Sequence, residues 1–170
     1  FTAILKELKR KRPEFVFLPG YYNEVGRILR QARQMKINVP FLGGDGWNSP
    51  KLQELAGANG IKNSYISSHF SADDQDPVVQ AFVQKYIKLH NKSPGTMAAL
   101  GYDSMLVLQD AMKRASTLSP QDIAKAISHT KNFKGVTGTI TLDKFRNASK
   151  SVVILKTTAS GNRFHIKINP

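Results

Sequence analysis

The sequence contains no cysteine, which excludes disulfide bonds, thiol catalysis, cysteine-ligated zinc and iron-sulfur clusters. It has only four histidines, and none follows the HExxH spacing of zinc enzymes, so we expect no metal site. The phosphate-binding patterns GxGxxG and GxxxxGK[ST] are missing, so no nucleotide or other cofactor is expected. A GxSxG nucleophile elbow is missing too, and we expect no enzyme.

Long apolar runs are also missing, because none approaches the roughly 20 residues that span a bilayer. The length and composition are those of a globular protein: 170 residues, with 41% hydrophobic and 22% charged residues. The sequence starts at Phe1, in the middle of an amphipathic pattern. We therefore expect it to be a segment of a longer protein.

Basic residues are in large excess, with 25 Lys and Arg against 12 Asp and Glu and a net charge of +13. This excess raises nucleic acid or an anionic membrane as a partner. The charge lies at the two ends of the chain, and its first cluster falls at the end of a predicted helix, where cations offset the helix dipole. No zinc-finger, RNP-like or helix-turn-helix pattern accompanies it, so we do not expect a nucleic-acid partner.

The first part of the chain alternates helical and strand patterns. Helices between strands require parallel strands with right-handed crossovers, so this part predicts a slice of a doubly wound α/β sheet. The predicted order is a helix up to Pro13, a short buried strand at 15–18, a helix at 25–35, a strand at 37–42, a helix from Pro50 capped by Ser49, and a strand at 61–67.

The remainder of the chain, from residue 69, is dominated by helical patterns and closes with strands. This order is awkward for one sheet and easier if the chain passes between two lobes. The predicted helices are 78–89, 98–115 and 120–130, and the predicted strands are 136–142, 151–156 and 163–168, with a turn at Gly161-Asn162.

Two predicted strand ends carry residues suited to a ligand. They are PGYYNE (19–24) and GGDGW (43–47). Loops from neighbouring parallel strands meet at one edge of a sheet, so Tyr21 and Asp45 would face one cleft. A carboxylate can pair with an ammonium group and a tyrosine offers a flat face or a hydroxyl, which suits an amino acid. Alternatively, the glycines form a simple turn, Asp45 caps the next segment and Tyr21 packs on the surface.

Four segments together resemble the branched-chain amino acid (Leu/Ile/Val) binding proteins of ABC transporters. The resemblance implies a two-lobed type I periplasmic-binding-protein fold with a parallel doubly wound sheet, of which this chain is the C-terminal half. The segments are FVFLPGYYNEVGRILRQAR (15–33), VPFLGGDGW (39–47), AALGYDSMLVLQDAMKRA (98–115) and GVTGTITLD (135–143), the last followed by the strand SVVILK.

The resemblance also implies an organisation and a setting. Residues 1–68 and 149–170 would belong to one lobe, and residues 69–148 to the other. The protein would be an exported, periplasmic or cell-envelope binding protein, monomeric when full length, which presents an amino acid to a membrane permease. The same fold also serves as the sensing domain of receptors, and a basic polyanion-binding module stays open as an alternative.

Individual roles follow from the same resemblance. Tyr21 matches the tyrosine that lines the family's cleft, and Asp45 matches the acidic residue that pairs with the ligand's α-ammonium group. Asp45 stands where the best-known members have glutamate, one methylene longer. We also expect the ligand to contact Tyr22 and Trp47, which lie beside these two residues, and Met97, which lies near the family's apolar contact from the other lobe. The groups that bind the ligand carboxylate would lie upstream of this sequence.

Overall fold

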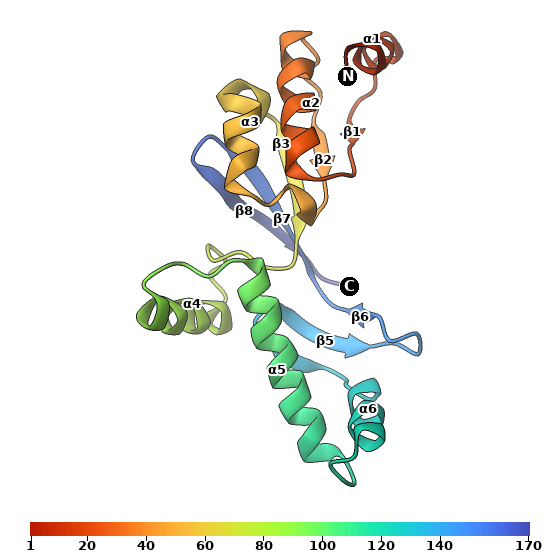
Figure 1. The fold of residues 1–170 in the computed structure, drawn as a ribbon, viewed down its shortest axis with the longest axis vertical. Helices are drawn as coiled ribbons and strands as arrows, with labels where there is room; N and C mark the ends of the chain where they lie inside the picture. The colour runs from red at the N-terminus through yellow and green to blue at the C-terminus, as the bar shows by residue number, and fades with distance from the viewer. The chain divides into compact units, whose positions relative to one another are not determined.

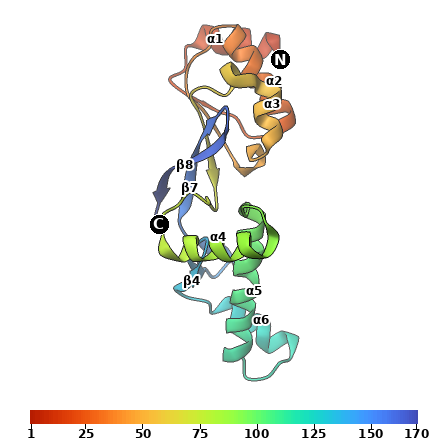
Figure 2. The ribbon, with the colours of Figure 1, turned by 90° about the vertical axis from the view of Figure 1, so that its left-hand side faces the viewer.

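The structure, a computed structural model, describes residues 1–170 and divides into two compact units (Figures 1 and 2). Unit 1 consists of Phe1–Ser68 and Val153–Ile166, and unit 2 of His69–Val152 and Lys167–Pro170. The predicted lobes change at 68/69 and 148/149, whereas the units change at 68/69, 152/153 and 166/167. Assignment of these units to the two lobes of a longer protein stays a prediction. No helix is long and apolar enough to cross a membrane.

Unit 1 is built around a mixed five-stranded sheet in the order β1-β2-β3-β7-β8. Strands β1, β2 and β3 are parallel, which confirms the α/β class predicted from the sequence, and β7 pairs with β3 in the antiparallel direction. The elements are α1 (Thr2–Lys11), β1 (Val16–Phe17), α2 (Tyr22–Gln34), β2 (Phe41–Gly43), the 3-10 helix η1 (Asp45–Trp47), α3 (Pro50–Gly60), β3 (Ser64–Ser68), β7 (Val152–Thr158) and β8 (Gly161–Ile168).

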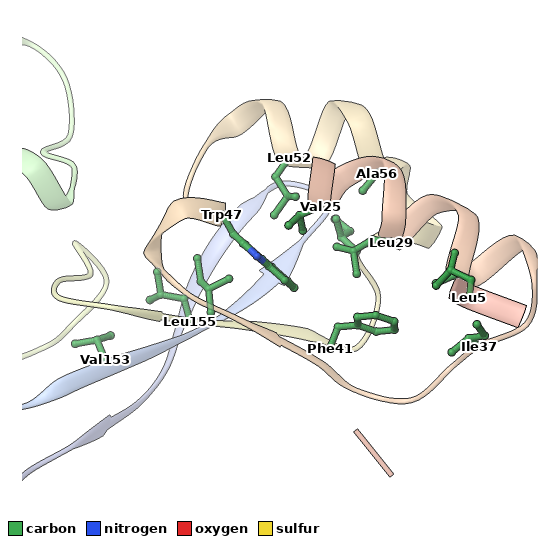
Figure 3. Close-up of a cluster of buried hydrophobic side chains, with 13 residues drawn as sticks. Leu5, Val25, Leu29, Ile37, Phe41, Trp47, Leu52, Ala56, Val153 and Leu155 are labelled. Atoms are coloured by element: carbon green, nitrogen blue, oxygen red, sulfur yellow. The ribbon is translucent and has the colours of Figure 1, made fainter. Parts of the chain in front are cut away.

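The core of unit 1 lies between the sheet and its helices (Figure 3). Val25, Leu29 and Ala32 follow the spacing of one helix face, and this face of α2 is buried. Ser49 caps α3 as predicted, accepting a hydrogen bond from the backbone N–H of Lys51 at 3.3 Å. The helical face and the cap therefore explain why these segments fold as they do.

Two predictions for unit 1 are wrong in detail. The strand at 15–18 was expected to be buried, but Phe15 and Phe17 are 57% and 65% exposed. Val16 and Leu18 pack against the core, and the two phenylalanines alternate with them and point to the other face of the sheet. The turn expected at Gly161-Asn162 falls at residues 159–160 instead, and these two residues begin β8. Thr158 fixes the observed turn with a hydrogen bond from its Oγ1 to the carbonyl of Gly161 at 2.6 Å.

Unit 2 packs helices against a small antiparallel sheet in the order β4-β5-β6. The strand expected at 136–142 is observed over 138–142 only, and short strands that were not expected, at 133–135 and 148–149, pair with it. Ser119 caps α6 as predicted, accepting from the N–H of Asp122 at 3.2 Å. The elements are α4 (Pro77–His90), α5 (Thr96–Arg114), α6 (Pro120–Ser128), β4 (Phe133–Gly135), β5 (Gly138–Leu142) and β6 (Ala148–Ser149).

A buried carboxylate fixes the hairpin of unit 2. Asp103, on α5, accepts hydrogen bonds from the backbone N–H groups of Val136 and Thr137, both at 2.7 Å. Lys150 donates to Thr137 Oγ1 at 2.6 Å. Burial lowers the pKa of Lys150, while the charge of Asp103 opposes this shift. Sequence analysis did not single out Asp103, because its partners are more than 30 residues away along the chain.

Two helical glycines give a matched test of the packing between α2 and α3. A Cβ added to Gly26 would lie 2.7 Å from Leu55 Cβ, whereas one added to Gly101 on α5 would meet nothing within 4 Å. We expect Gly101→Ala to stabilise the protein by about 0.5–1 kcal/mol through helix propensity. We expect Gly26→Ala to destabilise it by about 1–3 kcal/mol through overpacking. Urea unfolding followed by circular dichroism measures both, and equal effects would contradict the close approach of the helices.

The Asp103 network generates a second prediction. Asn at position 103 would turn its NH₂ group toward one of two backbone donors, so Asp103→Asn should cost about 1–3 kcal/mol. Asp110 on the same helix pairs with Arg114 at 2.8 Å in a partly exposed position, so Asp110→Asn should cost about 0.5 kcal/mol or less. Scanning calorimetry compares the two variants. A loss for Asp103→Asn no greater than that for Asp110→Asn would show that the network adds nothing.

Candidate ligand-binding site

The candidate site lies where the parallel strands β1 and β2 end. The strands are in register, with Phe17 opposite Leu42, and the N–H of Leu18 donates to the carbonyl of Leu42 at 2.8 Å. After β1 the chain enters α2, whose N-cap residue is Tyr21. After β2 it enters η1, which begins at Asp45. Both predicted ligand residues therefore stand at the carboxyl edge of the sheet, at the start of a helix.

The two loops that carry these residues are in contact. A Cβ added to Gly46 would lie 2.8 Å from the carbonyl oxygen of Gly20 and 3.1 Å from Cδ1 of the Tyr21 ring. The ring of Tyr21 thus lies against the residue that follows Asp45, and only glycine allows this approach. The Tyr21 side chain is 71% exposed, and Asp45 is exposed as well. A phenol and a carboxylate are consequently presented together on one open edge of unit 1.

Trp47 holds this edge together from the inside. Its side chain is 0% exposed, and its indole N–H donates to the carbonyl of Leu18 at 3.1 Å (Figure 3). A Cβ added to Gly43 would lie 2.1 Å from Cε2 of the indole, so the ring fills the space that glycine leaves. This placement contradicts the prediction that Trp47 contacts a ligand. The signal that was read as an aromatic ligand contact belongs to an aromatic core residue.

The other two predicted residues lie in different surroundings. Tyr22 is half-buried and packs against the core of unit 1. Met97 belongs to unit 2, where it is the second residue of α5 and is 74% exposed. Ser67, at the end of β3, donates from its Oγ to the carbonyl of Gly43 at 3.5 Å, so the end of a third strand adjoins the same edge.

The chemistry available at this edge is binding rather than metal coordination. No group of three or more His, Asp or Glu side chains in the structure could hold a metal ion. An exposed carboxylate at the start of a helix can pair with a cation, and a tyrosine beside it can donate or accept a hydrogen bond or cover an apolar group. These two groups could pair with an ammonium group.

Comparison with known proteins identifies relatives over almost the whole chain. The model of the family described as "Periplasmic binding protein" matches residues 1–162. The leucine-specific-binding protein of Salmonella typhimurium is 32% identical over 126 residues, which are 74% of this chain and 33% of that protein. A Pseudomonas aeruginosa protein that binds leucine, isoleucine, valine, threonine and alanine is 27% identical over 85% of this chain and 38% of its own length.

Solved structures agree with these matches. A leucine-binding protein of Thermotoga maritima has a TM-score of 0.87 and 35% identity, over 100% of this chain and 49% of that protein. A branched-chain amino acid substrate-binding protein of Streptococcus pneumoniae, solved with isoleucine, has a TM-score of 0.80 and 34% identity, over 99% of this chain and 49% of that protein. The chain spans about half the length of these structures and about one third of the curated relatives.

The contact between the two loops can be tested with neighbouring glycines. Gly46→Ala should destabilise unit 1 by about 1–3 kcal/mol, because its Cβ would meet the backbone of Gly20. Gly44→Ala should be close to neutral, since nothing lies within 4 Å of an added Cβ. Trp47 is the single tryptophan, so its fluorescence during urea unfolding reports on this edge directly. Two variants of equal stability would contradict the contact.

Proposed function

This chain belongs to the periplasmic binding protein family, and we propose that it provides part of the ligand cleft of an exported amino-acid binding protein that serves an ABC transporter. The relatives named above bind leucine or several small amino acids, by their printed names. They are binding proteins rather than enzymes, and the family name supports a location outside the cytoplasmic membrane. A permease that accepts the amino acid is the corresponding partner.

The single observation that carries this proposal is the contact that brings Tyr21 beside the Asp45 loop. In the proposed mechanism Asp45 pairs with the α-ammonium group of the amino acid, and Tyr21 covers or hydrogen-bonds the same end of the ligand. The aspartate is one methylene shorter than the glutamate of the best-known members, so the ammonium group must sit closer to the loop backbone. Gly44, just before Asp45, leaves room for that approach, because nothing lies within 4 Å of a Cβ added there.

The remainder of the cleft would come from a longer protein. This chain spans about half the length of its structural relatives, and the ligand's carboxylate has no assigned partner here. The exposed Phe15 and Phe17 support the same view, because further chain packed on their face of the sheet would bury both. Met97 of unit 2 is proposed as an apolar contact for the amino-acid side chain.

The proposal predicts that Asp45 contributes most of the ammonium recognition. In the longer protein that contains this segment, Asp45→Asn should weaken binding of leucine, isoleucine or valine by about 30-fold or more, because a desolvated ammonium group loses its counter-charge. Glu54→Gln removes the same charge from an exposed position of unit 1 and should leave the dissociation constant unchanged within about twofold.

Isothermal titration calorimetry measures both variants. An unchanged affinity in Asp45→Asn would remove Asp45 from the site. A wild-type protein that binds none of the three amino acids would overturn the ligand class itself.

A further inference from the structure

The opposite end of unit 1 has a different chemical character from the candidate site. The amino ends of β1, β2 and β3 meet there: the N–H of Val16 donates to the carbonyl of Pro40 at 2.9 Å, and the N–H of Phe41 donates to the carbonyl of Asn63 at 3.0 Å. Helices α1, α2 and α3 end in the residues that precede these strands. This end of the unit is therefore formed by helix C-termini and the loops that follow them.

Exposed cations gather at this end. They come from the last turn and cap of α1, from α2 and from the loops before β2 and β3, and cross-links join these segments: Lys9 Nζ donates to the carbonyl of Met35 at 2.9 Å, and the Arg33 guanidinium donates to the carbonyls of Val39 and Lys62. We call the exposed set the basic pole: Arg10, Lys11, Arg12, Arg30, Lys36 and Lys62.

The basic pole carries more charge than the fold requires. A helix C-terminus is equivalent to about −0.5 charge, so three of them attract about 1.5 positive charges. Lys9 and Arg33 already donate to backbone carbonyls at the helix ends and loops, and burial lowers the pKa of Arg33 without a carboxylate beside it. The six exposed cations come in addition to these two.

Few acids offset the basic pole. Lys11 pairs with Glu7 at 3.4 Å, and Arg30 donates to the backbone carbonyl of Glu54 at 3.1 Å. Glu14 is the remaining acidic residue between α1 and β1. Unit 1 as a whole has 13 Lys and Arg against 5 Asp and Glu. The self-repulsion of such a cluster is relieved by an anionic surface.

We propose that the basic pole docks on an anionic phospholipid surface. Flexible cations spread over the ends of three helices suit a diffuse, laterally mobile array of head groups. The helices present carbonyl groups at this end, so the backbone N–H site that grips a single phosphate is absent here. No helix N-terminus is presented for insertion into a nucleic-acid groove, which favours the bilayer over a duplex. A hollow of about 730 Å³ lies at this end, lined by Arg30, Arg33 and Lys62 among others, and it can accommodate lipid head groups.

The test measures partitioning of this chain onto lipid vesicles by co-sedimentation. We expect binding to vesicles of phosphatidylcholine with 30% phosphatidylglycerol, as a chosen probe composition, no binding to pure phosphatidylcholine, and release by salt near 0.5 M, where screening is strong. The test variant combines Arg10→Gln, Arg12→Asn, Lys36→Asn and Lys62→Gln. Arg12 and Lys36 have positive φ, at 49° and 59°, which asparagine tolerates.

A matched control removes four exposed lysines from unit 2, as Lys88→Gln, Lys92→Gln, Lys113→Gln and Lys125→Gln, so both variants have the same net charge. At about fivefold per cation, the test variant should lose on the order of 100-fold or more in partitioning, and the control only a few-fold. Thermal melting verifies that both variants stay folded.

Three results would overturn the proposal: equal binding to neutral vesicles, equal losses in the two variants, or binding to duplex DNA without binding to vesicles. No amino acid takes part in the assay, so its outcome is independent of the proposed ligand site at the other end of the strands.

Discussion

The carboxyl edge of unit 1 depends on one buried indole. Trp47 spans the space between the two loops that follow β1 and β2, with its N–H bound to the carbonyl of Leu18 and its ring over Gly43. A tryptophan that is fully buried contributes both a large apolar area and a hydrogen bond that has no solvent substitute. With this anchor in place, the Asp45 loop has little freedom to move away from Tyr21. A fully buried residue therefore fixes the geometry of the candidate site.

The two ends of the parallel strands have opposite chemistry for a reason rooted in chain direction. In a βαβ unit every helix starts near the carboxyl end of one strand and ends near the amino end of the next. The acidic residues Glu24 and Asp45 therefore fall in first helical turns, where negative charge is favoured. Arg33 and the cations of α1 fall in last turns, where positive charge is favoured. The direction of the βαβ connections thus places acidic residues at the carboxyl ends of the strands and basic residues at their amino ends.

The sequence predicted the architecture well because helical and strand periodicities alternate clearly in residues 1–68. It failed where position in the sheet, rather than local pattern, decides the outcome. Phe15 and Phe17 look like part of a buried strand, but burial on both sides requires a packed layer on each face of the sheet. Only the face of Val16 and Leu18 packs against the core. Trp47 was expected to contact the ligand beside Asp45, yet its ring is buried in the space that Gly43 leaves.

Asp103 shows a second limit of sequence analysis. Nothing in the segment GYDSM marks its aspartate as buried, since its partners are backbone N–H groups of a hairpin far along the chain. A side chain that binds main-chain atoms leaves no pattern in the residue types of its partners. Tyr21 and Asp45 were accessible to sequence analysis for the opposite reason, because parallel strands bring their carboxyl ends together wherever they occur.

The free energies of single interactions indicate how much of a tight binding site this chain could supply. An ion pair exposed to water contributes about 0–1 kcal/mol, whereas a micromolar dissociation constant requires about 8 kcal/mol. Asp45 and Tyr21 are exposed on unit 1, so their interactions with an amino acid would be weak as they stand. The pair gains strength only when a second surface excludes water from it and supplies donors for the ligand carboxylate. The proposed amino-acid binding would therefore be tight only in an assembly that covers this edge, with the open edge of unit 1 proposed to position the ammonium group.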